Sequence, residues 1–183
     1  MSLTVTACGT DSNSYVTIAE MDAFVAEQIT SDAVTAWTAL VDANKEKYLI
    51  QACRQIDRAH RYVGRKITSL TGDDAQALEF PRFSFDYTGG KANLEAYRSD
   101  GTYAVDERVK RAQMLQALHL VQIVEVEGGD PMIGGGTRAK LQAEGVTQIR
   151  TGNTSESYNG KVNSLCAAAE QELAALVRKA SRI

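Results

Sequence analysis

The strongest constraint on the fold is the stretch from Asp106 to Glu127, where apolar residues recur three or four positions apart. This spacing predicts one long α-helix, because residues three and four apart share a side of a helix. Asp106 suits the N-cap, and Gly128 and Pro131 end the pattern. Only a narrow strip stays polar, namely Gln113, Gln116, His119 and Gln122. A helix this apolar has to be covered on two sides, so we predict that it is the central helix of a helical domain.

Shorter helical patterns precede and follow this central helix. Thr17 and Glu20 have the spacing of a capping box, which predicts a helix that runs to about Gln28. A short helix carrying Trp37 follows, and then a longer one that Asp42 or Asn44 caps and that ends near Arg61. The polar side of this longer helix reads as a solvated charged face: Lys45, Glu46, Arg54, Asp57, Arg58 and Arg61.

These patterns predict a mainly α fold, a small helical bundle with a long central helix, a short β-hairpin-like element and a C-terminal helix. We assign residues 1–183 to a single domain. Its parts are a helical core over about 15–82 and 106–128, an insert over 83–105, a flexible β-element over 131–158 and a C-terminal helix over 161–180. Asp-Gly and Gly-Gly pairs in the insert suit a hairpin or a surface loop, and Gly152-Asn153 suits the turn of the β-element.

Composition excludes several protein classes. A net charge of -3 lacks the basic surplus of an electrostatic DNA binder, although a local basic patch stays compatible with it. The three cysteines lie far apart without a CxxC pair, so we expect reduced thiols and neither disulfides nor a zinc site. The N-terminus lacks the pattern of a signal peptide, and no segment reaches the length of a membrane span. We therefore expect a soluble intracellular or assembled protein with no membrane partner.

No catalytic constellation assembles in the sequence. Gly134-Gly135-Gly136 with Lys140 lacks the spacing of a P-loop and reads as a flexible linker. The only histidines, His60 and His119, lie on different predicted helices without a paired acidic motif. Asp73-Asp74 can cap a helical turn without any ion. We therefore expect no enzymatic activity, no cofactor and no metal.

One basic cluster has two interpretations. Arg61, Arg65, Lys66 and Arg82 are interleaved with Tyr62 and Phe83. Cations beside aromatic rings can bind single-stranded nucleic acid through phosphate contacts and stacking. The alternative is a structural loop, in which the arginines are held by helix C-terminal carbonyls and by nearby carboxylates.

The order of motifs adds a family resemblance. The segments NSYVTIAEMDAF, KYLIQACRQID, RYVGRK and QALEFPR follow one another, and Val109-Lys110-Arg111-Ala112 begins the central helix. This order resembles the phage head–tail adaptor proteins, a group often labelled DnaT-like single-stranded-DNA-binding. The chain departs from the family pattern at Cys53 and Phe80, and its insert after Arg82 is longer.

The resemblance implies a structural adaptor, or head completion protein, in the virion neck of a tailed phage, assembled first in the host cytoplasm. Its partners would be further copies of itself in a ring, expected to be a dodecamer, together with the portal protein and a tail or next neck protein. Double-stranded DNA would pass through without sequence-specific binding. The alternative function is a DnaT-like single-stranded nucleic-acid-binding module that uses the basic cluster.

Two regions are the candidates for partner contact under the adaptor interpretation. One is the end of the C-terminal helix, where three cations crowd together: Arg178, Lys179 and Arg182. The other is the β-element, at Ile149 and Arg150. Helix C-termini attract cations, so the first group has a purely local explanation as well.

Overall fold

The computed structural model describes residues 2–67, 76–83, 98–99, 102–128, 148–151, 154–157 and 165–177. These residues form a mainly helical fold, as the sequence predicts. The helices are α1 (Ile18–Ala26), α2 (Asp32–Ala39), α3 (Asp42–Ala59), α5 (Glu107–Val121), the π-helical η2 (Gln122–Val126) and α7 (Ala167–Leu173). The short strands are β1 (Arg65–Lys66), β2 (Arg82–Phe83), β3 (Arg98–Ser99), β4 (Thr102–Tyr103), β5 (Gln148–Thr151) and β6 (Thr154–Ser157). No helix among the described residues has the length and apolar character needed to cross a bilayer.

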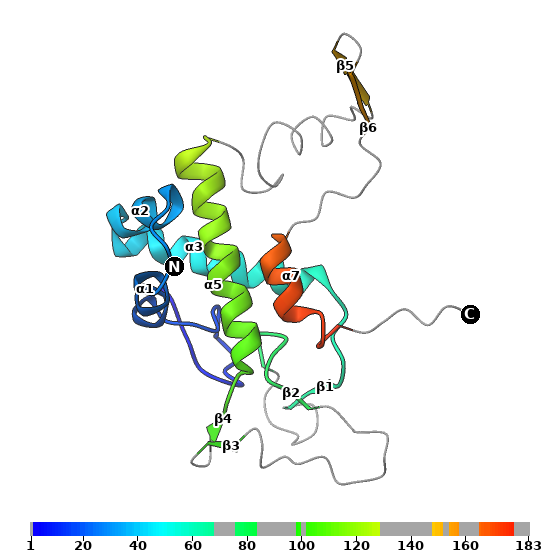
Figure 1. Cartoon of the computed structure of the whole chain (residues 1–183). Coiled ribbons are helices and arrows are strands. Elements are labelled where there is room, and N and C mark those ends of the chain that lie inside the picture. Colours follow the sequence, from blue (N-terminus) through cyan, green and yellow to red (C-terminus); the bar gives the residue numbers. More distant parts are fainter. Residues whose placement is uncertain are drawn as a thin grey trace, which may run out of the picture.

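Helix α5 is the central helix, and it is covered on two sides. Figure 1 shows α1 and α2 on one side of α5 and α7 on the other, with α3 crossing behind it. The packed pairs include α5 with α3, α5 with α7 and α2 with both α5 and η2. The predicted cap is confirmed, since the Asp106 side chain accepts the backbone N–H of Arg108 at 2.9 Å. Helices of the same chain therefore cover the wide apolar face of α5.

Two apolar clusters form the core, and both α3 and α5 contribute to each. The first joins Cys53 and Ile56 of α3 and Val109 of α5 to residues of α7 such as Leu173. The second joins the other ends of α3 and α5 to α1 and α2, and includes Met21, Trp37, Leu49, Ala52, Ala117 and Leu120. Because one pair of crossing helices serves both clusters, the side of α3 that faces inward is fixed along its length.

Two glutamines of the narrow polar strip on the central helix, Gln113 and Gln116, are buried. The Gln113 amide accepts the backbone N–H of Tyr15 at 2.9 Å and donates to the carbonyl of Leu49 at 2.9 Å. It also donates to the Ser14 hydroxyl at 2.7 Å. Both glutamines are fully buried. Their amides are satisfied by partners far away in the chain, which is the condition for burying a polar side chain at low cost.

The other local predictions have mixed outcomes. The capping box of Thr17 and Glu20 is formed. The cap predicted for α3 at Asp42 or Asn44 is wrong, because α3 already includes both residues and its N-cap, Val41, has no side chain that can accept a hydrogen bond. The hairpin predicted in the β-element is confirmed as the antiparallel pair β5–β6, and of the two alternatives for the insert, hairpin or surface loop, its described residues form the antiparallel pair β3–β4. The C-terminal helix is shorter than predicted, because α7 ends at Leu173 and turns so that Val177 bridges to Tyr62. Residues 131–147 and 161–164 lie outside the described ranges.

Replacing Gln113 by leucine tests the buried amide. The Gln113→Leu variant keeps the side-chain volume but leaves the Tyr15 N–H and the Ser14 hydroxyl without this partner. We expect the free energy of unfolding to fall by about 2–4 kcal/mol, measured by urea denaturation. The matched control is Gln122→Leu, because Gln122 bonds only at the surface, to Glu127. We expect the control to change stability by no more than about 0.5 kcal/mol, and equal losses in both variants would contradict the structural role of Gln113.

Candidate nucleic-acid interface

The outward side of α3 and the segment after it carry a concentration of positive charge. Six residues between positions 47 and 65 are exposed, and the only one that is not cationic is Val63. We call the other five the basic face: Lys47, Arg54, Arg58, Arg61 and Arg65. The three on α3 lie seven and four positions apart, and this spacing places them on one side of the helix. The other two follow within a few residues of the end of α3 at Ala59.

Core packing directs this face to solvent. Leu49, Ala52, Cys53 and Ile56 are fully buried and occupy the opposite side of α3. No carboxylate is exposed between positions 47 and 65. In the described part of the chain, Arg58, Arg61 and Arg65 form no ion pair with a carboxylate. Their charge is therefore available to an external anion.

The structure corrects two members of the solvated charged face expected on α3. Lys45 is buried, and its ammonium lies 3.0 Å from Asp22 and 5.5 Å from the centre of the Trp37 ring. Asp57 is largely buried as well, where it accepts hydrogen bonds from the Tyr15 hydroxyl at 2.5 Å and from the Glu79 amide at 3.2 Å. One cation and one acid therefore leave the exposed surface together, so the net charge of this face stays as the sequence suggests.

The predicted basic cluster is only partly a surface site. The Arg82 guanidinium donates to the carbonyls of Val63 at 3.1 Å and Gly64 at 2.7 Å, and it also pairs with Glu79. Lys66 lies 3.1 Å from the same carboxylate. Arg82 and Lys66 thus hold the β1–β2 loop together, which is the structural alternative for these two residues. Of the cations in this cluster, Arg61 and Arg65 stay exposed.

Tyr62 cannot stack on a nucleobase in this structure, contrary to the nucleic-acid interpretation. Only 2% of its surface is exposed, and its hydroxyl donates to the Ile56 carbonyl at 2.6 Å. Its ring packs against Phe80, with ring centroids 4.7 Å apart. Tyr62 is a core residue that closes the first apolar cluster.

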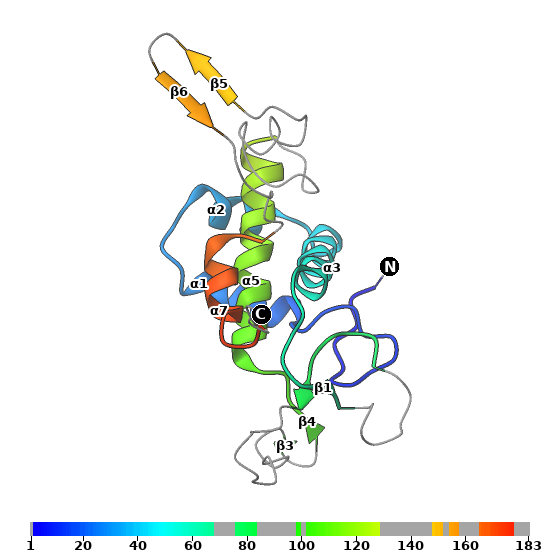
Figure 2. The same cartoon turned by 90° about the vertical axis from the view of Figure 1, so that its right-hand side faces the viewer.

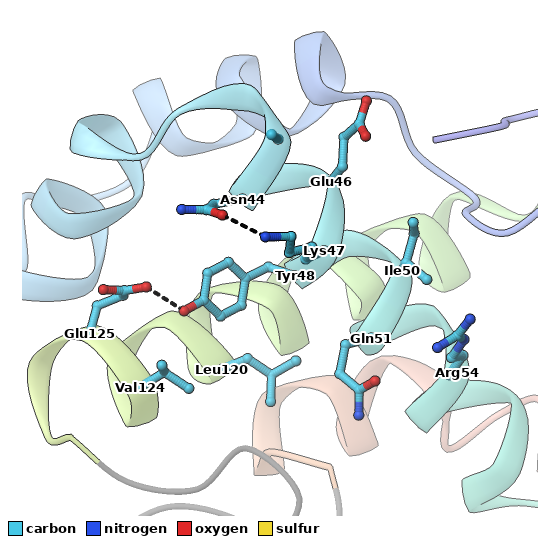
Figure 3. Close-up of a pocket in the computed structure, with 11 residues that line it drawn as sticks. Asn44, Glu46, Lys47, Tyr48, Ile50, Gln51, Arg54, Leu120, Val124 and Glu125 are labelled. Carbon is cyan, nitrogen blue, oxygen red and sulfur yellow. Dashed lines mark hydrogen bonds between the residues drawn. The ribbon is translucent and has the colours of Figure 1, made fainter. Parts of the chain in front are cut away.

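A groove runs beside the basic face, between α3 and the end of α5 with η2 (Figure 3). Its volume is about 750 Å³. Its walls combine apolar and aromatic side chains, among them Tyr48, Ile50, Leu120 and Val124. Figure 3 shows Tyr48 reaching from α3 toward η2, where its hydroxyl donates to Glu125 at 2.5 Å. Lys47 and Arg54 line the groove and belong to the basic face, so the two features are continuous.

Sequence reasoning missed this arrangement for an identifiable reason. Lys47, Arg54 and Arg58 are interspersed with Glu46 and Asp57 along the chain, so the segment reads as a mixture of charges. Sorting the charges by helix position separates them, since the acids lie about a quarter turn away from the cations at 3.6 residues per turn. That sorting was the signal available in the sequence.

Burial is the main cause of the pKa shifts of two thiols and one histidine in the described part of the chain. Burial raises the pKa of the Cys53 and Cys166 thiols, which keeps both thiols protonated. Burial also lowers the pKa of His119. His60 lies 2.7 Å from Glu170 and joins α7 to the end of α3. Among the described residues, no group of three or more histidines, cysteines or acids is placed to hold a metal ion.

The predicted partner-contact residues are not tested by the structure. Arg178, Lys179 and Arg182 lie outside the described residues. Ile149 and Arg150 belong to β5, which pairs with β6 in the register Ile149 with Glu156. Their side chains are likewise outside what the structure describes.

The burial of Asp57 predicts a pH effect on stability. Burial raises the pKa of Asp57 from 3.8 to about 6, although the hydrogen bonds from Tyr15 and Glu79 favour the charged form. The folded protein therefore binds a proton within this pH window that the unfolded chain releases, so this group's contribution to stability falls as pH rises through it. We expect acidification from about pH 7 to pH 4 to raise the free energy of unfolding of the parent protein by up to about 3 kcal/mol more than that of the Asp57→Asn variant. Parallel curves of unfolding free energy against pH would contradict this.

Comparison with known proteins identifies the family. Residues 1–182 match the model of a family described as "Putative DnaT-like ssDNA binding protein". Searches of the curated proteins and of the solved structures gave no match. The family description contradicts the phage head–tail adaptor function that we expected from the order of motifs, and it agrees with the alternative. The ring, the portal and tail partners and the virion location stay predictions that nothing here tests. The match covers nearly the whole chain, which therefore belongs to the DnaT-like single-stranded-DNA-binding protein family.

Proposed function

We propose that this protein binds single-stranded DNA through contacts between the basic face and the phosphate backbone. The observation that carries the proposal is the exposed surface of α3 and the following segment, where five cations occur without an exposed acid between positions 47 and 65. The family description supports the same ligand.

The charges and spacing fit a backbone contact rather than the reading of a base sequence. Arginine and lysine side chains on phosphates position a nucleic acid and carry no sequence information by themselves. Arg58, Arg61 and Arg65 lack ion-pair partners in the described part of the chain, so they need not break an internal contact to bind a phosphate. Phosphate contact by such side chains releases counterions from the strand, which makes affinity depend on salt.

The net charge of -3 is compatible with this proposal because the charges are segregated. Several carboxylates near the basic face are engaged inside the protein: Asp57 with Tyr15, and Glu79 with Lys66 and Arg82. Because the Debye length is about 8 Å at physiological salt, the attraction of a phosphate to this surface depends mainly on the charges closest to it. A strand at the basic face meets mainly cations, whatever the charge of the distant surface.

Removing two arginines from the basic face tests the proposal. The Arg58→Ser/Arg61→Ser double variant should bind oligothymidylate more weakly, and the slope of log affinity against log salt should become shallower by about 1.4. Fluorescence anisotropy over a salt series measures both. Exposed side chains at both positions make a folding defect unexpected, and circular dichroism and thermal melting check this.

The control is Arg108→Ser/Arg111→Ser, which removes the same charge from an exposed part of α5. We expect the control to keep the parent's salt slope. Equal changes in the two double variants would show that net charge alone governs binding, and would overturn the assignment to the basic face. Absence of salt-dependent binding by the parent would overturn the function itself.

A further inference from the structure

We propose that the groove between α3 and η2 takes unstacked bases of the bound strand, and that it makes the protein prefer single strands to duplexes. This inference rests on the proposed function and adds the part of the ligand that the basic face does not contact. The groove has about 750 Å³ of space, within the ~300–1,000 Å³ typical of ligand pockets.

The walls of the groove match the chemistry of a base. Val124 and the ring of Tyr48 are partly exposed and offer an apolar contact and a flat aromatic surface, while Ile50 and Leu120 line the groove as buried residues. The bond from the Tyr48 hydroxyl to Glu125 holds one end of this ring, so little side-chain freedom is left to lose when a base packs on it. Base stacking on aromatic side chains is tolerant of sequence, because every base has a π-face.

The charges around the groove orient the strand. Lys47 and Arg54 line the groove and also belong to the basic face, which places phosphate-binding groups at the edge of an apolar surface. Glu125 lines the groove from η2, and Glu46 lines it from α3 about a quarter turn away from the cations, and both acids repel phosphates. A strand is therefore favoured with its backbone along the side of α3 that carries Lys47 and Arg54, and with its bases turned toward η2. The Asn44 and Gln51 amides also line the groove, and the Asn44 oxygen accepts a hydrogen bond from Lys47 at 3.0 Å.

This arrangement selects against a duplex. Paired bases are stacked inside a double helix, and entering a pocket requires taking a base out of the stack at a cost of a few kcal/mol. Bases of a single strand do not have to break pairing. A basic face alone would bind both forms, whereas a base-filled groove adds affinity only for the single strand.

The test compares strands that share phosphates and differ in bases. The parent protein is titrated with oligothymidylate and with an abasic strand of the same length, by fluorescence anisotropy at one salt concentration. We expect roughly tenfold tighter binding of oligothymidylate, in line with the contribution of a stacked base. Tyr48→Ala should remove most of this difference, because it should weaken oligothymidylate binding more than abasic binding. Tyr48→Phe, the matched control, also loses the bond to Glu125 but keeps the ring, and it should keep most of the difference.

A second measurement does not depend on any variant. Oligothymidylate carrying 5-iodouracil is crosslinked to the parent protein by light, and the modified peptide is mapped by mass spectrometry. We expect the crosslink at Tyr48. Crosslinks found only outside the groove-lining residues would overturn the inference.

The outcomes separate this inference from the proposed function. Salt-dependent binding of both strands with equal affinity would overturn the groove and leave the basic face in place. Binding of neither strand would overturn both. If light scattering instead shows the parent to be a dimer that Tyr48→Ala dissociates, the groove is a contact between copies of the chain and the inference is wrong.

Discussion

The buried amide of Gln113 is the interaction on which the rest of the structure depends. Apolar side chains alone can pack in several registers, whereas an amide buried between three elements is satisfied in one arrangement only. Gln113 requires the Tyr15 N–H, the Ser14 hydroxyl and the Leu49 carbonyl at the same point. A buried polar group without partners costs about 1–3 kcal/mol, so displaced registers are penalised. The amide therefore fixes α5 against α3 and against the N-terminal segment.

A second buried glutamine extends this arrangement to α7. The Gln116 amide oxygen accepts the backbone N–H of Cys166 at 2.7 Å, just before α7 begins, and its nitrogen donates to Gln55 at 2.8 Å. Figure 2 shows α7 on the near side of α5, with α3 beside them. Once the inward side of α3 is fixed by these contacts, its opposite side has to face solvent. The basic face is thus a consequence of core packing.

The groove depends on a local departure from α-helical geometry. The chain leaves α5 through the π-helical turn η2, in which the Glu127 N–H bonds to the Gln122 carbonyl at 3.0 Å. Such turns are rare and occur frequently at functional sites, because they change the directions of the side chains they carry. Here the turn carries Val124 and Glu125, and both line the groove opposite Lys47 of α3. This five-residue element therefore adds one apolar and one acidic side chain to a groove whose other apolar residues come from α3 and α5.

The sequence by itself determined the helices, the caps of α1 and α5 and the hairpin of the β-element, because these depend on neighbours in the chain. The Thr17–Glu20 capping box, the Asp106 cap and the period of α5 involve residues at most a few positions apart. The exposed arginines of the candidate interface were also visible, since Arg61 and Arg65 belong to the predicted cluster. Only the tertiary structure decided which polar residues are buried. Gln113 meets Tyr15 across 98 positions and Asp57 meets Tyr15 across 42, and no local pattern encodes such pairings. Tyr62 and Arg82 stabilise the fold for the same reason: their hydrogen-bond partners come close to them only when the chain has folded.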